Sequence, residues 1–182
     1  MDALRAVWVI HYPEFGGPHN RAARCHHYLA EHGIDLSVVL PDEPGSAAGR
    51  LREAGVPVRT MPLVRLRLSA DPRLHLHWLR QFRADVARLR AHLRAERADA
   101  IILGGLVNVQ GAIAARLEKV GVVWQVIDTR IPVAGRAAFV PLLNAGADVV
   151  AFGGRQLIAA HPGARMLSNA TVCPPGVPTD AF

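Results

Sequence analysis

Short apolar segments alternate with longer amphipathic segments along the whole chain, and this alternation restricts the possible folds more than any other feature. The apolar segments, such as GVVWQVI and ADVVAFG, are continuous runs rich in β-branched residues. Continuous apolar strands are typical of a parallel sheet that is covered on both faces. We therefore expect strands at residues 4–11, 34–40, 56–63, 98–104, 121–127, 147–153 and 170–174.

The segments between these strands predict helices. Gly33 and Gly55 each follow one of them, as glycine does at helix C-termini. We expect helices at residues 19–32, 47–54, 72–96, 107–120, 136–144 and 154–161. Strands that alternate with helices, joined by right-handed crossovers, predict an α/β fold. The fold class is doubly wound and Rossmann-like, with about seven mostly parallel strands and helices on both faces.

Length and composition indicate a single globular unit. The chain has 182 residues, of which 51% are hydrophobic, and no apolar run approaches the roughly 20 residues that span a bilayer. The N-terminus lacks the basic segment of a signal peptide. Cys25 and Cys173 stand far apart without metal-binding spacing, which favours two free thiols. These features together predict a cytoplasmic protein.

The first candidate site is the segment PEFGGPHN, which follows the first strand. Ligands of such sheets bind at the carboxyl ends of the strands. Backbone amides near Gly16 and Gly17 could face an anion at the start of the following helix. The spacing matches neither the dinucleotide fingerprint nor the P-loop, which argues against a nicotinamide site. A plain tight turn is the alternative explanation for the two glycines.

Polar residues also follow the fourth and fifth strands. Asp128 could act as a general base or could instead cap a turn, and Arg130 could hold a phosphate. Asn108 could bind a hydroxyl group or cap the next helix. The histidines do not share helical faces in ligand spacing, and no D-x-D pair is present, so we expect no metal site.

The formal net charge of +6 is carried almost entirely by arginine. No zinc-finger or RNP-type motif accompanies it, so we expect no nucleic-acid partner. The predicted helix 72–96 has an apolar stripe of Trp78, Phe82, Val86, Leu89 and Leu93. Its arginines lie mostly off that stripe: Arg73, Arg80, Arg83, Arg90, Arg94 and Arg97. A solvated face is the favoured interpretation, and contact with anionic lipid at the inner face of a membrane is the alternative.

Five segments, in order, resemble the N-terminal lobe of GT-B glycosyltransferases of the large retaining family 4. They are YPEFGGPHNRAARCHHYLAEHGIDLSVVLP, LREAGVPVRTMPL, GAIAARLEKVGVVWQVIDT, AGADVVAFGGRQL and ATVCPPGVPTDAF. The resemblance covers essentially the whole chain. This sequence departs from the family pattern at several positions, namely Gly104, Gly105, Asp128, Gly153, Pro175 and Pro178.

The resemblance implies an acceptor-side lobe at residues 1–174 and an interdomain linker at 175–182. The C-terminal, donor-binding lobe would lie in the same parent chain or in a separate subunit. The co-substrate would be a nucleotide-sugar, with no other cofactor and no metal. The acceptor would be a small molecule or lipid-linked, and this chain alone would be inactive.

The resemblance also implies roles for the candidate residues. Gly16 and Gly17 would face the donor's diphosphate, and Asp128 would be the catalytic residue. The acceptor or the donor sugar would be bound by His11, Glu14, His19, Asn20, Asn108 and Arg130. Half of a sugar-nucleotide epimerase and a stand-alone Rossmann-like ligand-binding module are the alternatives.

Overall fold

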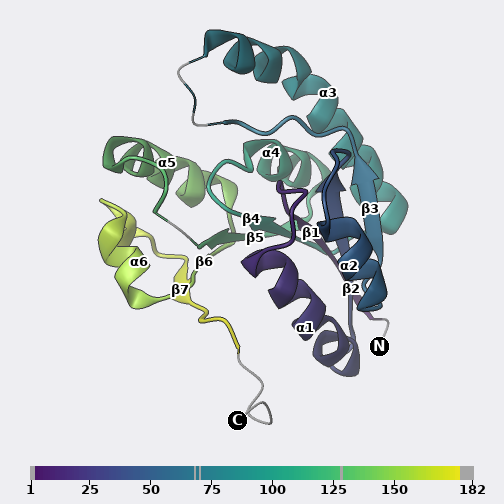
Figure 1. Ribbon diagram of the computed structural model, residues 1–182. Helices are drawn as coiled ribbons and strands as arrows, with labels where there is room; N and C mark the ends of the chain where they lie inside the picture. The colour runs from purple at the N-terminus through teal and green to yellow at the C-terminus, as the bar shows by residue number, and fades with distance from the viewer. Residues whose placement is uncertain (1–2, 68, 70, 128, 177–182) are drawn as a thin grey trace.

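A seven-stranded sheet forms the centre of the molecule in the computed structural model, which describes residues 3–67, 69, 71–127 and 129–176 (Figure 1). Its order is β3-β2-β1-β4-β5-β6-β7, and every neighbouring pair is parallel. The predicted doubly wound α/β fold is therefore confirmed. The strands are β1 Leu4–Val9, β2 Ile34–Pro41, β3 Val58–Met61, β4 Ala100–Gly104, β5 Gly121–Val126, β6 Val149–Phe152 and β7 Ala170–Val172.

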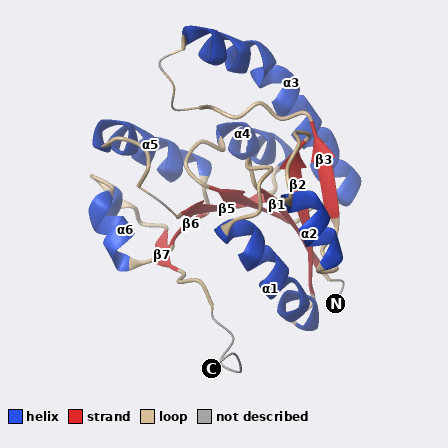
Figure 2. Cartoon of the chain, viewed as in Figure 1, coloured by secondary structure: helices blue, strands red, loops and turns tan. Residues whose placement is uncertain are grey.

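Helices connect successive strands, as Figure 2 shows. They are α1 Gly17–Glu31, α2 Ala47–Glu53, α3 Pro72–Glu96, α4 Val109–Glu118, α5 Val133–Gly146 and α6 Arg155–Ala160, with a short 3-10 helix at Ala164–Met166. The bounds of α3 agree with the prediction. Helix α1 begins two residues before the predicted 19, since Pro18 suits a first helical turn. Helix α5 begins three residues before the predicted 136, directly after Pro132.

Two hydrophobic clusters cover the two faces of the sheet. Helices α1 and α2 pack on one face, where Trp8, Leu36 and Leu51 are buried. The other cluster lies under α3, α4 and α5 and includes Leu89 and Trp124. The central strands β1, β2, β4 and β5 are thus covered on both sides, which explains their largely continuous apolar sequences.

The strand order places β1 beside β4, with Val9 opposite Leu103. The chain builds the sheet outward in one direction from β1 through β3, and in the other direction from β4 onward. This reversal is a topological switch point, and the crevice at the carboxyl ends of its strands is where such sheets bind ligands. The loops that follow β1, β4 and β5 therefore frame the candidate site.

Helix α3 is only half packed against the body. Its C-terminal half contributes Val86, Leu89 and Leu93 to the core. Its N-terminal half extends beyond the sheet, at the top of Figure 1, and there Leu76 and Leu79 are 46% and 60% exposed. Of the predicted apolar stripe, Val86, Leu89 and Leu93 are buried in the core, Phe82 is partly buried against it and Trp78 is partly exposed.

Two arginines of α3 serve packing between helices. Arg90 and Arg94 both donate hydrogen bonds to the carboxylate of Glu118 on α4. These bonds lower the pKa of Glu118 to about 2. Arg90 and Arg94 thus pair with a neighbouring helix while their side chains remain 35% and 61% exposed to solvent.

Candidate functional site

A cavity of about 290 Å³ opens at the carboxyl edge of the sheet, beside the switch point. We call it the arginine pocket. Residues from the loops after β1, β3, β4 and β5 line it. Its lining consists of Tyr12, Arg65, Leu66, Arg67, Gly104, Gly105, Leu106, Val107, Ile127, Arg130 and Ile131.

Arg65 is held in place on several sides. One of its Nη atoms donates to the backbone oxygen of His11 at 3.4 Å, and the other lies 3.5 Å from the Glu43 carboxylate. Its guanidinium also lies 5.3 Å from the centre of the Tyr12 ring. Arg67 approaches the same carboxylate oxygen of Glu43 at 3.7 Å. One acidic group is thus shared by two guanidiniums, which leaves this side of the pocket positively charged.

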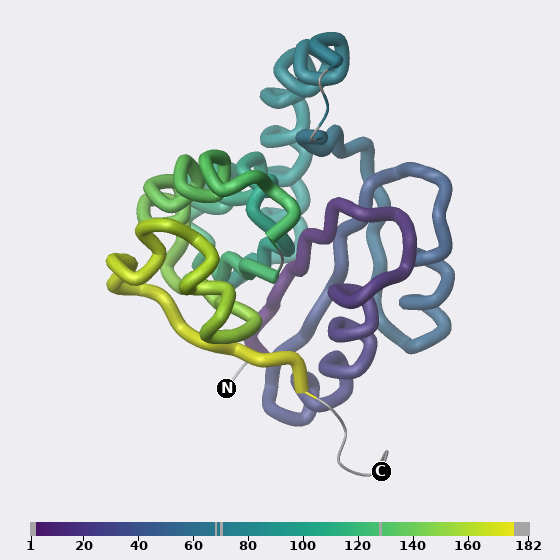
Figure 3. The backbone as a smooth tube through the Cα atoms, turned by 60° about the vertical axis from the view of Figure 1, so that its left-hand side comes forward, coloured from purple at the N-terminus to yellow at the C-terminus, as the bar shows by residue number. Residues whose placement is uncertain are grey.

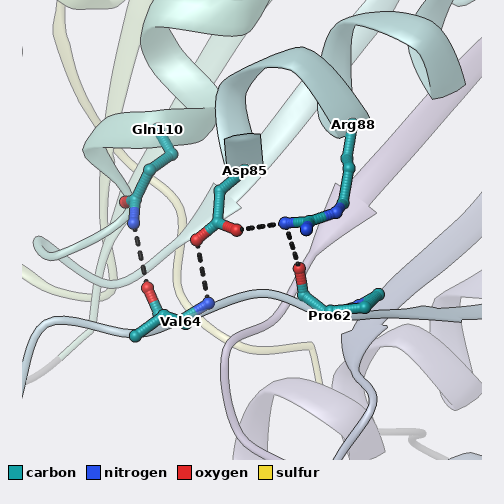
Figure 4. Close-up of polar contacts among 5 residues, drawn as sticks. All are labelled: Pro62, Val64, Asp85, Arg88 and Gln110. Carbon is teal, nitrogen blue, oxygen red and sulfur yellow. Dashed lines mark hydrogen bonds and ion pairs between the residues drawn. The ribbon is translucent and has the colours of Figure 1, made fainter. Parts of the chain in front are cut away.

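A buried polar clamp fixes the loop that carries these arginines (Figure 4). Asp85 of α3 accepts a hydrogen bond from the Val64 amide at 2.9 Å, and Gln110 of α4 donates to the Val64 carbonyl at 3.0 Å. Arg88 donates to the Pro62 carbonyl at 3.2 Å and to Asp85 at 2.7 Å. Two helices therefore hold the backbone immediately before Arg65.

Burial raises the pKa of the Asp85 carboxyl, while the Val64 amide and the Arg88 guanidinium oppose that shift. Sequence reasoning missed this clamp. One sequence feature could have pointed to it, because Asp85 stands three residues after Phe82 and four before Leu89, on the apolar face of α3. A carboxylate on such a face must have partners.

The glycine loop, residues 13–17, is shaped by His19. The amide of Gly16 donates to His19 Nδ1 at 3.1 Å, and His19 Nε2 lies 2.9 Å from the carbonyl oxygen of Tyr12. The imidazole is 1% exposed, and its burial lowers its pKa. His19 is therefore part of the loop's internal support.

The fold itself does not require glycine at residues 16 and 17. Gly16 has an extended φ of −151°, which any residue adopts, and the φ of Gly17 is not in the positive region that favours glycine. A Cβ atom at either position would meet nothing within 4 Å. A tight turn therefore does not account for this pair.

A second cavity of about 280 Å³ borders the glycine loop. Arg21 in its wall donates to the Cys173 sulfur at 2.9 Å, so that the segment after β7 lies against α1 (Figure 3). Ile127 lines both this cavity and the arginine pocket. The predicted catalytic residue, Asp128, follows it directly but lies outside the described residues, as do Pro178 and the rest of 177–182. The cavity is lined by Gly17, Pro18, Arg21, Gln125, Ile127, Gly153, Leu157 and Pro175.

The remaining predicted residues have different surroundings. His11 is 2% exposed, and its burial together with the charge of Arg65 lowers its pKa to about 4, so its imidazole is neutral at pH 7. Asn108 is buried and donates to the carbonyl of Val9 at 3.0 Å; it makes no side-chain cap to α4. Glu14 accepts from Ser46 Oγ at 2.8 Å, which joins the glycine loop to the start of α2.

Of the predicted site residues, Arg130 lines the arginine pocket and Gly17 lines the second cavity. Asn20 lies on the exposed side of α1. His11, His19 and Asn108 lie beneath the surface, where the latter two hold the backbone in place. Sequence reasoning did not identify Arg65 and Arg67, although both follow a predicted strand.

Residues 16–176 match the family model described as the glycosyl transferase 4-like domain. The chain belongs to this family. The match includes Gly16 and Gly17 of the glycine loop, strands β4 and β5, which border the cavities, and the segment after β7. No curated protein matches the chain's sequence.

Solved structures share the fold of this glycosyl transferase 4-like domain. A glycosyltransferase from Rickettsia africae is 12% identical with a TM-score of 0.68, over 99% of this chain and 45% of that one. Acinetobacter baumannii MurG is 17% identical with a TM-score of 0.61, over 96% of this chain and 47% of that one. A UDP-GlcNAc 2-epimerase from Neisseria meningitidis, bound to UDP-GlcNAc, is 12% identical with a TM-score of 0.62, over 93% of this chain and 46% of that one. The chain therefore spans under half the length of each of these three proteins.

Two features are absent from the part of the chain that the structure describes. No described helix combines the length and the apolarity needed to cross a membrane. Within the same residues, no three histidine, cysteine or acidic side chains gather as a metal site would require.

Proposed function

We propose that this chain is the acceptor-side lobe of a glycosyltransferase that moves a sugar from a nucleotide-sugar to an acceptor hydroxyl. The observation that carries the proposal is the glycine pair at residues 16 and 17. It stands at the carboxyl edge of a family-matched lobe, and the lobe itself requires no glycine there. Because glycine has no side chain, another group can approach the backbone at these two positions.

The approaching group in this proposal is the donor's diphosphate. Gly17 is the first residue of α1, where a backbone N–H has no intrahelical partner. Negative charge grows on the diphosphate as the bond to the sugar breaks, and a fixed amide at a helix N-terminus would stabilise it. The amide of Gly16 is already bonded to His19, so Gly17 supplies the available donor.

The acceptor lies on the other side of Ile127 in this proposal, in the arginine pocket. Asp128 then takes the proton from the acceptor hydroxyl, and Arg130 and Asn20 contact ligand directly. His19 and Asn108 hold the backbone of these loops from beneath. Glu14 joins the glycine loop to α2 at the surface, and the backbone carbonyl of His11 accepts a hydrogen bond from Arg65.

A second lobe completes the enzyme in this proposal. Residues 1–174 would form the acceptor lobe and residues 175–182 the start of the linker. The support is the comparison itself, since the chain covers under half of each related structure described above. The second lobe would hold the nucleotide-sugar, and no other cofactor or metal would be needed.

We also propose that the N-terminal half of α3 contacts anionic lipid. Arg73, Leu76, Leu79, Arg80 and Arg83 recur at spacings of three and four, so they share one helical face. All five are exposed. Leucines beside arginines on one projecting face are suited to an anionic membrane surface.

The experiment that tests the enzyme combines this chain with its donor lobe. Nucleotide-sugars and sugar acceptors are supplied, and nucleoside diphosphate release and the sugar product are followed by NMR. Release that requires an acceptor, with a new glycoside formed, supports transfer. An epimerised nucleotide-sugar formed without any acceptor would instead identify half of an epimerase, and the absence of both products would contradict the proposal.

A further inference from the structure

We propose that the arginine pocket binds a phosphate group carried by the acceptor. The identification of the ligand as the acceptor rests on the proposed function, whereas the phosphate site itself rests on the pocket. The glycine loop contributes no residue to this pocket, since Gly17 lines the second cavity. The molecule thus has one place for the donor's phosphates and another, separated by Ile127, for an anion of the acceptor.

The charge of the pocket favours an anion. Three of its lining residues are Arg65, Arg67 and Arg130. With Glu43 beside two of them and the Asp128 of the proposed function counted as well, the arginines still outnumber the carboxylates. Glu43 lies outside the lining and approaches two of the guanidiniums at 3.5 and 3.7 Å. These separations exceed a hydrogen bond, so the single carboxylate neutralises the pair only in part.

The pocket is also organised before any ligand arrives. Arg65 is only 21% exposed and is held by a carbonyl, a carboxylate and an aromatic ring. The clamp of Asp85, Arg88 and Gln110 fixes the backbone just before it. A guanidinium with restricted freedom loses little entropy on binding, and its planar fork matches the oxygens of a phosphate.

The remaining walls are apolar. They comprise Leu66, Leu106, Val107, Ile127 and Ile131. A cavity of about 290 Å³ with arginines and apolar walls accommodates a phosphate together with part of a carbon body. The shared chemistry is a phosphate ester, which either a soluble sugar phosphate or a lipid phosphate supplies.

The test is calorimetric titration of the 182-residue chain with three phosphate probes. The probes are inorganic pyrophosphate, glucose 1-phosphate and dihexanoyl phosphatidic acid, with glucose as the uncharged control. Arg65→Gln and Arg130→Gln each remove one guanidinium, and we expect binding to weaken at least about tenfold. Arg52→Gln, at an exposed arginine of α2, should leave binding unchanged. Thermal unfolding of every variant identifies any that fails to fold, and Arg65→Lys then replaces Arg65→Gln.

The two phosphate sources and the two phosphate sites are distinguished by the same titrations. Tighter binding of the phosphatidic acid than of glucose 1-phosphate assigns the pocket to a lipid phosphate, and the reverse assigns it to a soluble ester. Binding that survives Arg65→Gln and Arg130→Gln but is lost in Gly17→Ala would overturn the inference, as would no binding of any probe. Sugar transfer to an uncharged acceptor, with no probe bound, would overturn the inference alone. Phosphate binding without transfer in the two-lobed enzyme would overturn the proposed function alone.

Discussion

At the scale of single residues, Gly17 is a position where the fold and the proposed reaction place different requirements on the side chain. Its backbone is not in the left-handed region, and the space where a Cβ would lie is open. The fold should therefore accept a methyl group there. A ligand that must touch the backbone should not.

We expect Gly17→Ala to keep or slightly raise stability, by up to about 1 kcal/mol, because alanine restricts the unfolded chain. In the two-lobed enzyme, we expect the same change to lower kcat/KM by about a hundredfold, as loss of an oxyanion contact does. Urea unfolding and steady-state kinetics measure the two effects. Unchanged kinetics would show that no ligand approaches this loop, and Gly49→Ala, on α2, serves as the matched control.

His11 gives the chain a specific dependence on pH. Its folded pKa is about 4 and its usual value is 6.5. Between these values the unfolded chain holds a proton that the folded chain does not, so acid favours unfolding. The stability linked to His11 is complete above pH 6.5 and is lost as the pH falls toward 4.

Between pH 7 and pH 4, we expect the free energy of unfolding to fall by about 3 kcal/mol more for the wild type than for His11→Phe. Burial also lowers the pKa values of His19 and His92, but these residues make the same contribution to the pH dependence of stability in both proteins. Urea unfolding at a series of pH values measures the difference. Parallel pH profiles for the two proteins would mean that His11 is not held neutral.

At the scale of elements, α3 performs different tasks along its length. Its C-terminal half packs on the sheet and joins α4 through Glu118. Its middle carries Asp85 and Arg88 of the clamp. Its N-terminal half projects with leucines and arginines exposed on one face.

We expect Asp85→Ala to destabilise the chain by about 2–4 kcal/mol, because it leaves the Val64 amide and Arg88 without their buried partner. The pocket's affinity for pyrophosphate should fall as well, since Arg65 loses its fixed backbone. Urea unfolding and calorimetry measure the two effects. Asp35→Ala, at an exposed carboxylate of β2, is the control and should change neither.

We expect the chain to bind vesicles that contain anionic phospholipid through the projecting half of α3. Each arginine near such a surface contributes about 1 kcal/mol, so Arg80→Gln combined with Arg83→Gln should weaken binding roughly thirtyfold. Added salt should weaken it further. Co-sedimentation measures the binding, with Arg52→Gln combined with Arg155→Gln as the control of equal charge.

Negligible sedimentation of the wild type at low salt would contradict the proposal and show that the projecting arginines only face solvent. Equal losses in the control pair would show that net charge alone accounts for the binding. Leu76→Ser combined with Leu79→Ser then tests the apolar contribution, because these two leucines are exposed and support no core packing.

At the scale of the whole molecule, the sheet gathers loops from distant parts of the chain at one edge. The parallel order places the ends of β1, β4 and β5 together, and the loop after β3 reaches the same pocket. The two cavities meet at Ile127. A donor held by a second lobe would face this edge.

We expect this chain alone to leave nucleotide-sugars unchanged, because in the proposed function the second lobe holds the donor. Addition of that lobe should start acceptor-dependent release of nucleoside diphosphate. A coupled assay for the diphosphate, with and without the added lobe, measures the effect. Robust turnover by this chain alone would show that it contains a complete donor site.

The sequence by itself determined the elements and the layers of this protein. Each strand and helix has a periodicity that reflects its own hydrogen bonding and burial, and the bounds of α3 could be read directly. The parallel, doubly wound fold followed from the order of those elements. The position of Gly16 and Gly17 directly after the first strand could also be predicted, because it depends only on local order.

Only the tertiary structure decided how the side chains meet. Val64 is paired with residues 21 and 46 positions away, and Arg65 with the carbonyl of a residue 54 positions away. Contacts of this range depend on where the sheet places each loop, which no local pattern encodes. The same holds for α3, whose N-terminal half extends past the edge of the sheet, so that Leu76 and Leu79 are exposed although Leu89 and Leu93 of the same helix are buried.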